Sequence, residues 1–186
     1  MMKFKPTLLV GILALACGSG MAQTEQAGQV HSLDFRTQTY TRQSTVVNGQ
    51  TVAYRAYENI VYVANPADSA YQTINIYIPE AYFSGGSING YTAQTSPIFL
   101  PNQIGDYMPA KAGVPGKGGF GPSKEGQVDA MQVALARGYV VASPGARGRT
   151  AATGKAPAAI VDLKAAVRYL RFNDAVMAGD AEKNHL

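Results

Sequence analysis

The chain of 186 residues contains one cysteine, two histidines and no tryptophan. A single cysteine, Cys17, excludes an internal disulfide and a metal site built from several thiolates. The histidines, His31 and His185, lie near the ends of the chain, where solvated side chains are the rule. No HExxH or comparable spacing of His, Asp and Glu is present, so the sequence predicts neither a metal site nor a cofactor.

Charged residues are also scarce, at 15% of the chain against 46% hydrophobic residues. This balance is typical of a globular domain. The formal net charge is +4, and Lys3 and Lys5 contribute two of these charges, which leaves +2 for the rest. No basic run occurs, so nothing in the charge pattern indicates nucleic-acid binding.

Residues 1–22 have the pattern of a signal peptide: two lysines, the apolar run "LLVGILALA" and the small residues "GMA" before Gln23. The apolar run is too short to span a bilayer. Cys17 in "ALAC" also resembles the lipidated cysteine of a bacterial lipoprotein signal, although such signals usually carry Leu or a similar residue at Ala14. We therefore expect export to the periplasm or medium, or alternatively an outer-membrane lipoprotein with a lipid anchor at Cys17.

The N-terminal half predicts β-strands. Thr37–Val47 and Gln50–Tyr57 flank Asn48-Gly49, which is a strong signal for a two-residue hairpin turn. Ile60–Ala64 and Thr73–Ile78 are two further β-rich runs. A short apolar strand in "SPIFLPN" and a long Gly/Pro-rich loop from Gly105 to Gly126 follow.

The C-terminal half alternates helices and strands. Val128, Met131 and Leu135 have helical spacing, Gly138 suits the position after a helix end, and "YVVAS" is a buried strand. A long helix follows, in which one apolar stripe is predicted to face the sheet and an acid, Asp162, to lie with the basic residues on the other side. The stripe consists of Ile160, Leu163, Val167 and Leu170. The pattern predicts an α/β fold with antiparallel N-terminal strands leading into parallel βαβ units, and Gly179 is expected to end the last helix.

The serines do not match the nucleophile elbow GxSxG, in which a serine stands between a strand and a helix. Ser87, Ser123 and Ser143 lie in "GGSIN", "GPSKE" and "VASPG". The glycine-rich runs "GKGGFG" and "GARGRT" lack the spacing of phosphate-binding loops. No pair of carboxylates suggests glycosidase chemistry, and Asp162, Asp174 and Asp180 are interpreted as helix-surface or boundary acids.

Four phrases carry a resemblance to a known family: "YVANPADSAYQTINIYIPE", "INGYTAQTSPIFLPNQIGDYMP", "GYVVASPGARGRT" and "GKAPAAIVDLKAAVRYLRFND". They resemble the N-terminal part of bacterial subtype-B tannases and their feruloyl-esterase-like relatives in the α/β-hydrolase superfamily. The similarity runs from about Tyr62 to Lys183. In that family a helix like Ala158–Met177 is followed by a strand and a "GxSAGG" elbow.

The resemblance implies hydrolysis of galloyl esters by a Ser-His-Asp triad. By chain order, all three triad residues are expected beyond Leu186. The resemblance also implies that the backbone N–H groups of Ile104 and Gly105 form half of an oxyanion hole, with the other half following the serine. An aromatic ester is the expected substrate.

These expectations divide the sequence into two parts. Residues 1–22 are the signal peptide, and residues 23–186 are the N-terminal part of an α/β-hydrolase domain that is truncated before the nucleophile elbow. We expect an inactive fragment of an exported carboxylic-ester hydrolase, because a short polar end, "NHL", replaces the apolar strand expected after "GDAEK". The alternative is a non-catalytic exported module that binds phenolic esters or cell-wall glycans. A weaker third interpretation is another member of the superfamily, such as a peptidase or acetyl esterase.

Overall fold

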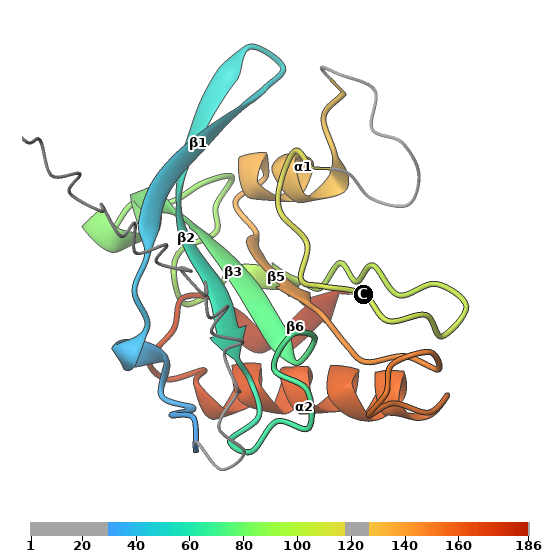
Figure 1. Cartoon of the computed structure of the whole chain (residues 1–186). Coiled ribbons are helices and arrows are strands. Elements are labelled where there is room, and N and C mark those ends of the chain that lie inside the picture. The colour runs from blue at the N-terminus through green and yellow to red at the C-terminus, as the bar shows by residue number, and fades with distance from the viewer. Residues whose placement is uncertain (1–29, 118–126, 186) are drawn as a thin grey trace, which may run out of the picture.

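The structure is a computed structural model that describes residues 30–117 and 127–185 (Figure 1). The predicted signal peptide, Cys17 and Ser123 lie outside the described residues, as does most of "GKGGFG". His185 is placed in a strand, but its side chain is not described.

Six strands of the described chain form one mixed sheet. They are β1 (Thr41–Val47), β2 (Gln50–Val61), β3 (Thr73–Pro79), β4 (Pro97–Phe99), β5 (Val140–Pro144) and β6 (Asp180–His185). Their order across the sheet is β1-β2-β3-β5-β4-β6. The first pairings, up to β3 with β5, are antiparallel, whereas β4 is parallel to both β5 and β6. The predicted α/β fold with antiparallel strands leading into parallel ones is confirmed.

The predicted hairpin is confirmed at Asn48-Gly49. Both residues have positive φ, 50° and 77°, which is the backbone of the two-residue turn that matches the twist of paired strands. The two β-rich runs expected before and after Tyr57 prove to be one strand, β2. Its register shifts between Tyr57 and Ile60, where Asn59 has a φ of 61° and donates its N–H to Asn75 Oδ1 at 2.8 Å.

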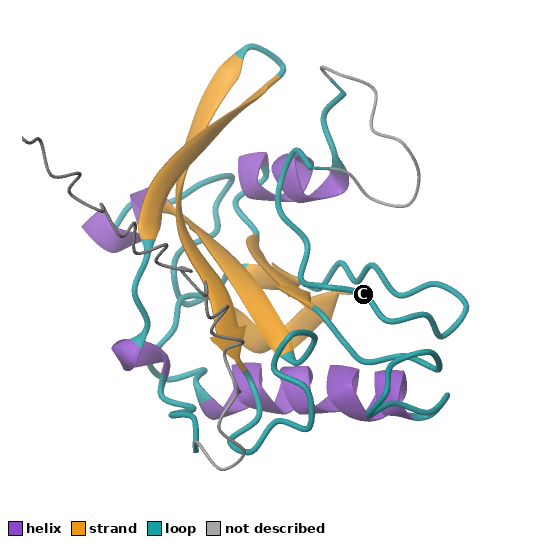
Figure 2. Ribbon diagram, in the orientation of Figure 1, coloured by secondary structure: helices purple, strands orange, loops and turns teal. Residues whose placement is uncertain are grey.

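One helix covers each face of the sheet (Figure 2). Alternate residues of β3 point to opposite faces, so Ile74, Ile76 and Ile78 pack in the core beneath α2 (Ala158–Phe172). On the other face, Tyr77 packs with Met131 of α1 (Ala130–Ala136). Two short 3₁₀ helices, η1 (Phe35–Thr37) and η2 (Glu80–Ser84), complete the described fold.

Sequence-local signals set the limits of α1. Asp129 and Gln132 form a reciprocal capping box at its start, with the Gln132 N–H donating to Asp129 at 2.8 Å. Gly138 follows the helix with a φ of 87°, as predicted, because a side chain is strained in that conformation. A Cβ there would also lie 2.9 Å from Tyr82 Oη.

The predicted orientation of α2 is wrong in two places. Ile160 of the expected core stripe is 58% exposed, while the Asp162 side chain, expected on the surface, is only 1% exposed. The helix buries a different stripe, Ala159, Asp162, Ala166, Tyr169 and Leu170. The prediction placed the larger aliphatic side chains of the helix in the core. In the structure the buried side of α2 consists mainly of small or aromatic residues and one ion-paired carboxylate.

The end of α2 and the segment after it also differ from the prediction. The helix ends at Phe172, not at Met177, because the Asn173 side chain leaves the helix to accept from the Phe35 N–H and donate to the Leu33 carbonyl, both at 2.9 Å. The polar residues after Gly179 are not an irregular end: they form β6, which pairs with β4.

Candidate functional site

Two loops leave the sheet at the carboxyl ends of β4 and β5, and a third segment crosses them. Residues 101–109 follow β4 and residues 145–157 follow β5. The segment 110–114 crosses between them, joined by paired backbone hydrogen bonds of Ala110 and Ala146 at 3.0 and 2.8 Å. In sheets with parallel strands, ligands bind beyond these carboxyl ends, so this edge is the candidate site.

Ser143, at the end of β5, joins two of these segments. Its Oγ accepts from the Gly113 N–H at 3.0 Å and donates to the Pro101 carbonyl at 2.8 Å. Ser143 is fully buried. Its hydroxyl therefore fixes the start of the loop after β4 and is occupied by structural bonds, consistent with the absence of a nucleophile elbow at this serine.

Gly113 is held from the other side by the sheet. Its carbonyl accepts from Asn75 Nδ2 and from Tyr77 Oη, each at 3.1 Å. Burial, followed by the nearby Glu58 carboxylate, raises the pKa of Tyr77 far above its usual value, so the phenol stays protonated. A Cβ at Gly113 would lie 2.8 Å from Ser143 Oγ, which explains why glycine stands at this crossing.

Ile104 and Gly105, the predicted oxyanion-hole residues, are half-buried in the loop after β4. The Ile104 N–H donates to Asn102 Oδ1 at 3.2 Å, and the Gly105 carbonyl accepts from the Met108 N–H at 2.9 Å. Within the described part of the chain, the Gly105 N–H has no hydrogen-bond acceptor. The assignment of these amides to an oxyanion hole stays a prediction.

Asp162 of α2 stabilises the loop after β5. Its carboxylate accepts from Arg147 Nε and a terminal guanidinium nitrogen at 2.9 and 2.8 Å, from the Arg147 backbone N–H at 2.9 Å, and from Gln72 Nε2 at 2.8 Å. The hydrogen-bonded carboxylate raises the pKa of Arg147. The interpretation of Asp162 as a surface acid is therefore wrong: a buried carboxylate needs such a set of donors.

The structure does not assemble the described serines and histidines into a catalytic group. Ser87 is exposed in the turn after η2, and His31 is half-buried near the N-terminal end of the described chain. Among the described residues, His31 forms its only hydrogen bond through its backbone, to the Ala64 carbonyl at 2.9 Å. Residues 30–117 and 127–185 contain no group of three His, Cys, Asp or Glu side chains placed to hold a metal ion.

Two adjoining cavities lie along the segment 110–117. The larger, about 590 Å³, is bounded by residues from β2, β3 and the N-terminal segment, including Glu58 and His31. The smaller, about 370 Å³, includes Gln103 of the loop after β4. Lys111 and Lys117 line both. We call the pair the lysine groove; no pattern in the sequence predicted it, because its residues come from distant segments.

No helix in the described residues has the length and apolar character needed to cross a membrane. The sequence matches no protein-family model, and no curated protein matches it.

Solved structures of tannases are similar to this chain in both fold and sequence, which supports a tannase-like relationship. The crystal structure of Fusobacterium nucleatum tannase is 51% identical over 83% of the chain, with a TM-score of 0.76. A crystal structure of tannase from Lactobacillus plantarum is 38% identical over 78% of the chain, with a TM-score of 0.68. The resemblance predicted from the sequence is confirmed.

The chain spans about a third of the length of these tannases: 32% of the F. nucleatum enzyme and 31% of the L. plantarum enzyme. Two other similar structures are tannin acyl hydrolases in complex with ethyl gallate and with 3,4-dihydroxybenzoate, at 39% and 40% identity. Both have a TM-score of 0.69, and the chain covers 32% of each.

Proposed function

We propose that this chain forms the N-terminal part of a tannase-like hydrolase of aromatic carboxylic esters, and that it has no esterase activity by itself. The observation that carries the proposal is the 51% identity to a tannase of which the chain matches 32%. The described residues contribute no serine bonded to a histidine, so the Ser-His-Asp triad would come from outside them. The α/β sheet here would then be one portion of a larger hydrolase sheet.

The proposed contribution of this chain to catalysis is the oxyanion hole. When a serine attacks an ester carbonyl, negative charge develops on the carbonyl oxygen, and fixed backbone N–H groups stabilise it. The Gly105 N–H suits this role because no acceptor occupies it within the described chain, whereas the Ile104 N–H is bonded to Asn102. Ser143 supports the loop by holding the Pro101 carbonyl.

The lysine groove is the proposed approach for the aromatic ester. It extends from Gln103, next to the Ile104–Gly105 loop, along the face of the sheet that α2 does not cover. Lys111 and Lys117 present ammonium donors, which suit the acidic hydroxyl and carboxyl oxygens of hydroxybenzoates. Hydroxybenzoate and gallate ligands of the similar tannin acyl hydrolases are of this chemical class.

A hydrolysis assay tests the proposal directly. The purified chain should show no turnover of methyl gallate or p-nitrophenyl acetate above background. Co-expression with the part of F. nucleatum tannase that the chain does not match should restore turnover. Replacing Gly105 by Pro, which removes the N–H, should abolish the restored activity, while Asp106→Asn should retain it.

Two results would contradict the proposal. The first is turnover by the chain alone that survives further purification and is lost in Ser87→Ala. The second is a well-folded complex with the complementary tannase part that stays inactive. The DNA downstream of the last codon offers an independent check, because an in-register or one-base-shifted "GTSAGG" would identify the missing elbow.

We also propose export, on the basis of the leader in residues 1–22. The two forms of the leader predict different products. A cleaved signal peptide gives a chain that begins at Gln23, whereas a lipoprotein begins with an acylated Cys17. The intact mass of the protein from a periplasmic or membrane fraction separates the two, and Cys17→Ser abolishes membrane association only in the second case.

A further inference from the structure

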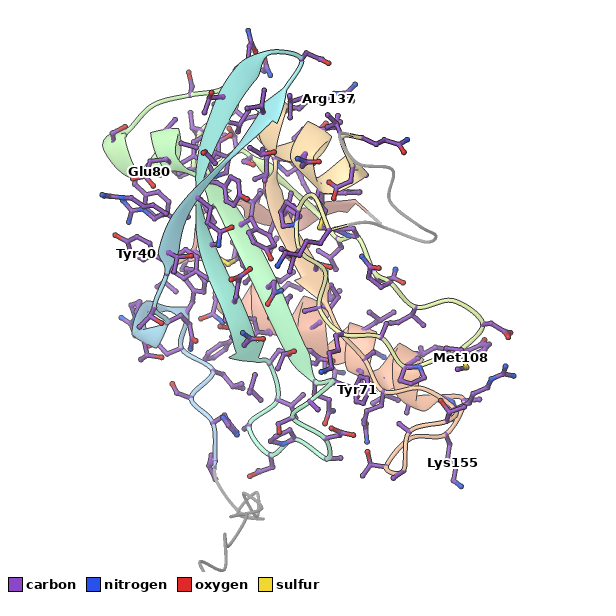
Figure 3. All side chains as sticks on the ribbon, turned by 45° about the horizontal axis from the view of Figure 1, so that its top comes forward. Tyr40, Tyr71, Glu80, Met108, Arg137 and Lys155 are labelled. Carbon is purple, nitrogen blue, oxygen red and sulfur yellow. The ribbon has the colours of Figure 1, made fainter. Side chains whose placement is uncertain are left out.

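A third cavity lies at the end of the sheet opposite the candidate site. It has a volume of about 580 Å³, within the range of small-molecule sites, and it lies before the starts of β4 and β6. We call it the Phe83 cavity; the lining residues that matter here are Phe83, Gln94, Asp174, Val176, Met177 and Asp180. Figure 3 shows how far apart the two ends are: Glu80, at the start of η2, and Met108, in the loop after β4, lie on opposite sides of the molecule.

The walls of the Phe83 cavity are mixed, with more polar than apolar surface, and two large hydrophobic side chains supply much of the apolar part. Phe83 is 40% exposed and Val176 is 43% exposed, and both line this cavity. Met177 is buried behind them. An aromatic ring placed between Phe83 and Val176 would remove apolar surface from water, which is the main driving force for binding such a ligand.

The polar side chains of the cavity include two carboxylates, which accept hydrogen bonds, and the Gln94 amide, which can both donate and accept. Asp174 accepts from the Ala181 N–H through Oδ1 at 2.7 Å, and within the described chain its Oδ2 accepts no hydrogen bond. Asp180 pairs with Lys183 at 2.7 Å, and this hydrogen bond lowers the pKa of Asp180, so it stays ionised. Asp180 also accepts from the Glu182 N–H at 3.1 Å, and no Lys or Arg is among the described lining residues, so Asp174 Oδ2 is the acceptor that a ligand hydroxyl can satisfy.

Arg55 already occupies one side of the Phe83 ring, which disfavours a cationic ligand at that ring. Its guanidinium lies 3.5 Å from the centre of the Phe83 ring, and two 3.1 Å hydrogen bonds to Glu80 hold it there. A second cation at this ring would meet the positive charge of Arg55. The guanidinium is attracted to the electron density of the Phe83 ring and polarises it. The polarised ring is expected to stack on an electron-rich ring in preference to binding another cation.

We propose that the Phe83 cavity is a second, non-catalytic binding site for a neutral aromatic ring that carries hydroxyl groups. The ring contacts Phe83 and Val176, and its hydroxyl groups donate to Asp174 and Asp180. This site is separate from the Ile104–Gly105 loop and from the lysine groove, and its occupancy does not depend on ester hydrolysis.

Titration of the purified chain with methyl gallate, followed by calorimetry and by NMR shifts, tests the proposal. Two probes serve as controls: methyl 3,4,5-trimethoxybenzoate, which has no hydroxyl donor, and phenethylammonium, which is cationic. We expect saturable binding of methyl gallate only, with about tenfold weaker binding in Asp174→Asn and in Val176→Ala. The amide oxygen introduced by Asp174→Asn can still accept from the Ala181 N–H, so the fold is preserved; Asp106→Asn, far from the cavity, should bind as the unchanged chain does.

Three results would overturn the proposal: no saturable binding of methyl gallate, equal or tighter binding of either control probe, or unchanged affinity in both cavity variants. The last result would place the ligand elsewhere. A Lys111→Ala, Lys117→Ala double variant then identifies the lysine groove, because only binding there is lost in it. Circular dichroism of every variant separates loss of binding from loss of folding, and Asp180→Asn replaces any variant that unfolds.

Discussion

Asp162, in the first half of α2, forms a bidentate pair with Arg147 beyond the end of β5. The carboxylate is 1% exposed and the guanidinium side chain 12% exposed, and their closest atoms are 2.8 Å apart. Gln72 and the Arg147 N–H complete the set of donors to Asp162. The pair therefore fixes the loop after β5 to the helix that covers one face of the sheet.

We predict that Asp162→Ala destabilises the chain by about 3 kcal/mol, because it leaves a largely buried guanidinium without its partner. Urea unfolding measures the change. The matched control is Arg149→Ala, which breaks the exposed pair with Asp106 (51% and 80% exposed) and should change the free energy of unfolding by less than about 0.5 kcal/mol. Equal effects of the two substitutions would contradict this account.

Ser143→Ala should destabilise the chain by about 2 kcal/mol, because it leaves the buried Gly113 N–H and the Pro101 carbonyl without their partner. Hydrogen exchange should also become faster in residues 102–105. Ser143→Cys, which keeps a weak donor and acceptor, should lose less stability. Unchanged exchange in the loop of the alanine variant would show that Ser143 does not hold it.

The stability of the chain should fall as the pH rises above about 10. Burial raises the pKa of Tyr62, Tyr77 and Tyr169 above the ordinary value of 10.0. Above pH 10 the unfolded chain therefore binds fewer protons than the native chain, and the free energy of unfolding decreases with pH. Absorbance at 295 nm should show these tyrosines ionising only as the chain unfolds.

Tyr169→Phe is the matched variant for this pH dependence. The Tyr169 hydroxyl is buried and has no hydrogen-bond partner among the described residues, so its removal should not lower stability at neutral pH. Above pH 10, the slope of the free energy of unfolding against pH should become shallower by the contribution of one bound proton. If the variant is less stable at pH 7 and its free energy of unfolding falls equally steeply above pH 10, Tyr169 does not contribute to the pH dependence.

Replacing Ile160 and Phe172 by Lys should reduce self-association of the chain. These residues are 58% and 70% exposed on the outer side of α2, and exposed apolar side chains promote aggregation. Sedimentation velocity should show less high-mass material, with the melting temperature within a few degrees of that of the unchanged chain. A large loss of stability would mean that these side chains belong to the core.

Local chemistry explains most of what the sequence predicted correctly. Asn48-Gly49 and Gly138 adopt positive φ where turn and helix-end signals predicted them, and the apolar runs of β3 and β5 are buried strands. These signals act within a few residues. The Gly/Pro-rich composition also predicted the loop that starts near Ile104, but its role as half of an oxyanion hole came only from the resemblance.

Long-range partners explain what the sequence could not predict. The burial of Asp162 depends on Arg147 and Gln72, and the end of α2 depends on contacts of Asn173 with residues 138 and 140 positions away. The spacing of apolar residues carries no information about these distant partners. The prediction from spacing therefore placed Asp162 on the surface and made α2 too long. The lysine groove and the Phe83 cavity were not predictable for the same reason.

The hydrogen bond between the Phe35 N–H and Asn173 also sets an order of events during synthesis. Phe35 is among the first described residues to leave the ribosome, yet its partner follows 138 residues later. Loop closure over such a distance is slow and comes late in folding. The N-terminal segment can therefore contact Tyr57 early in translation, but its docking is completed only after α2 and Asn173 have been synthesised.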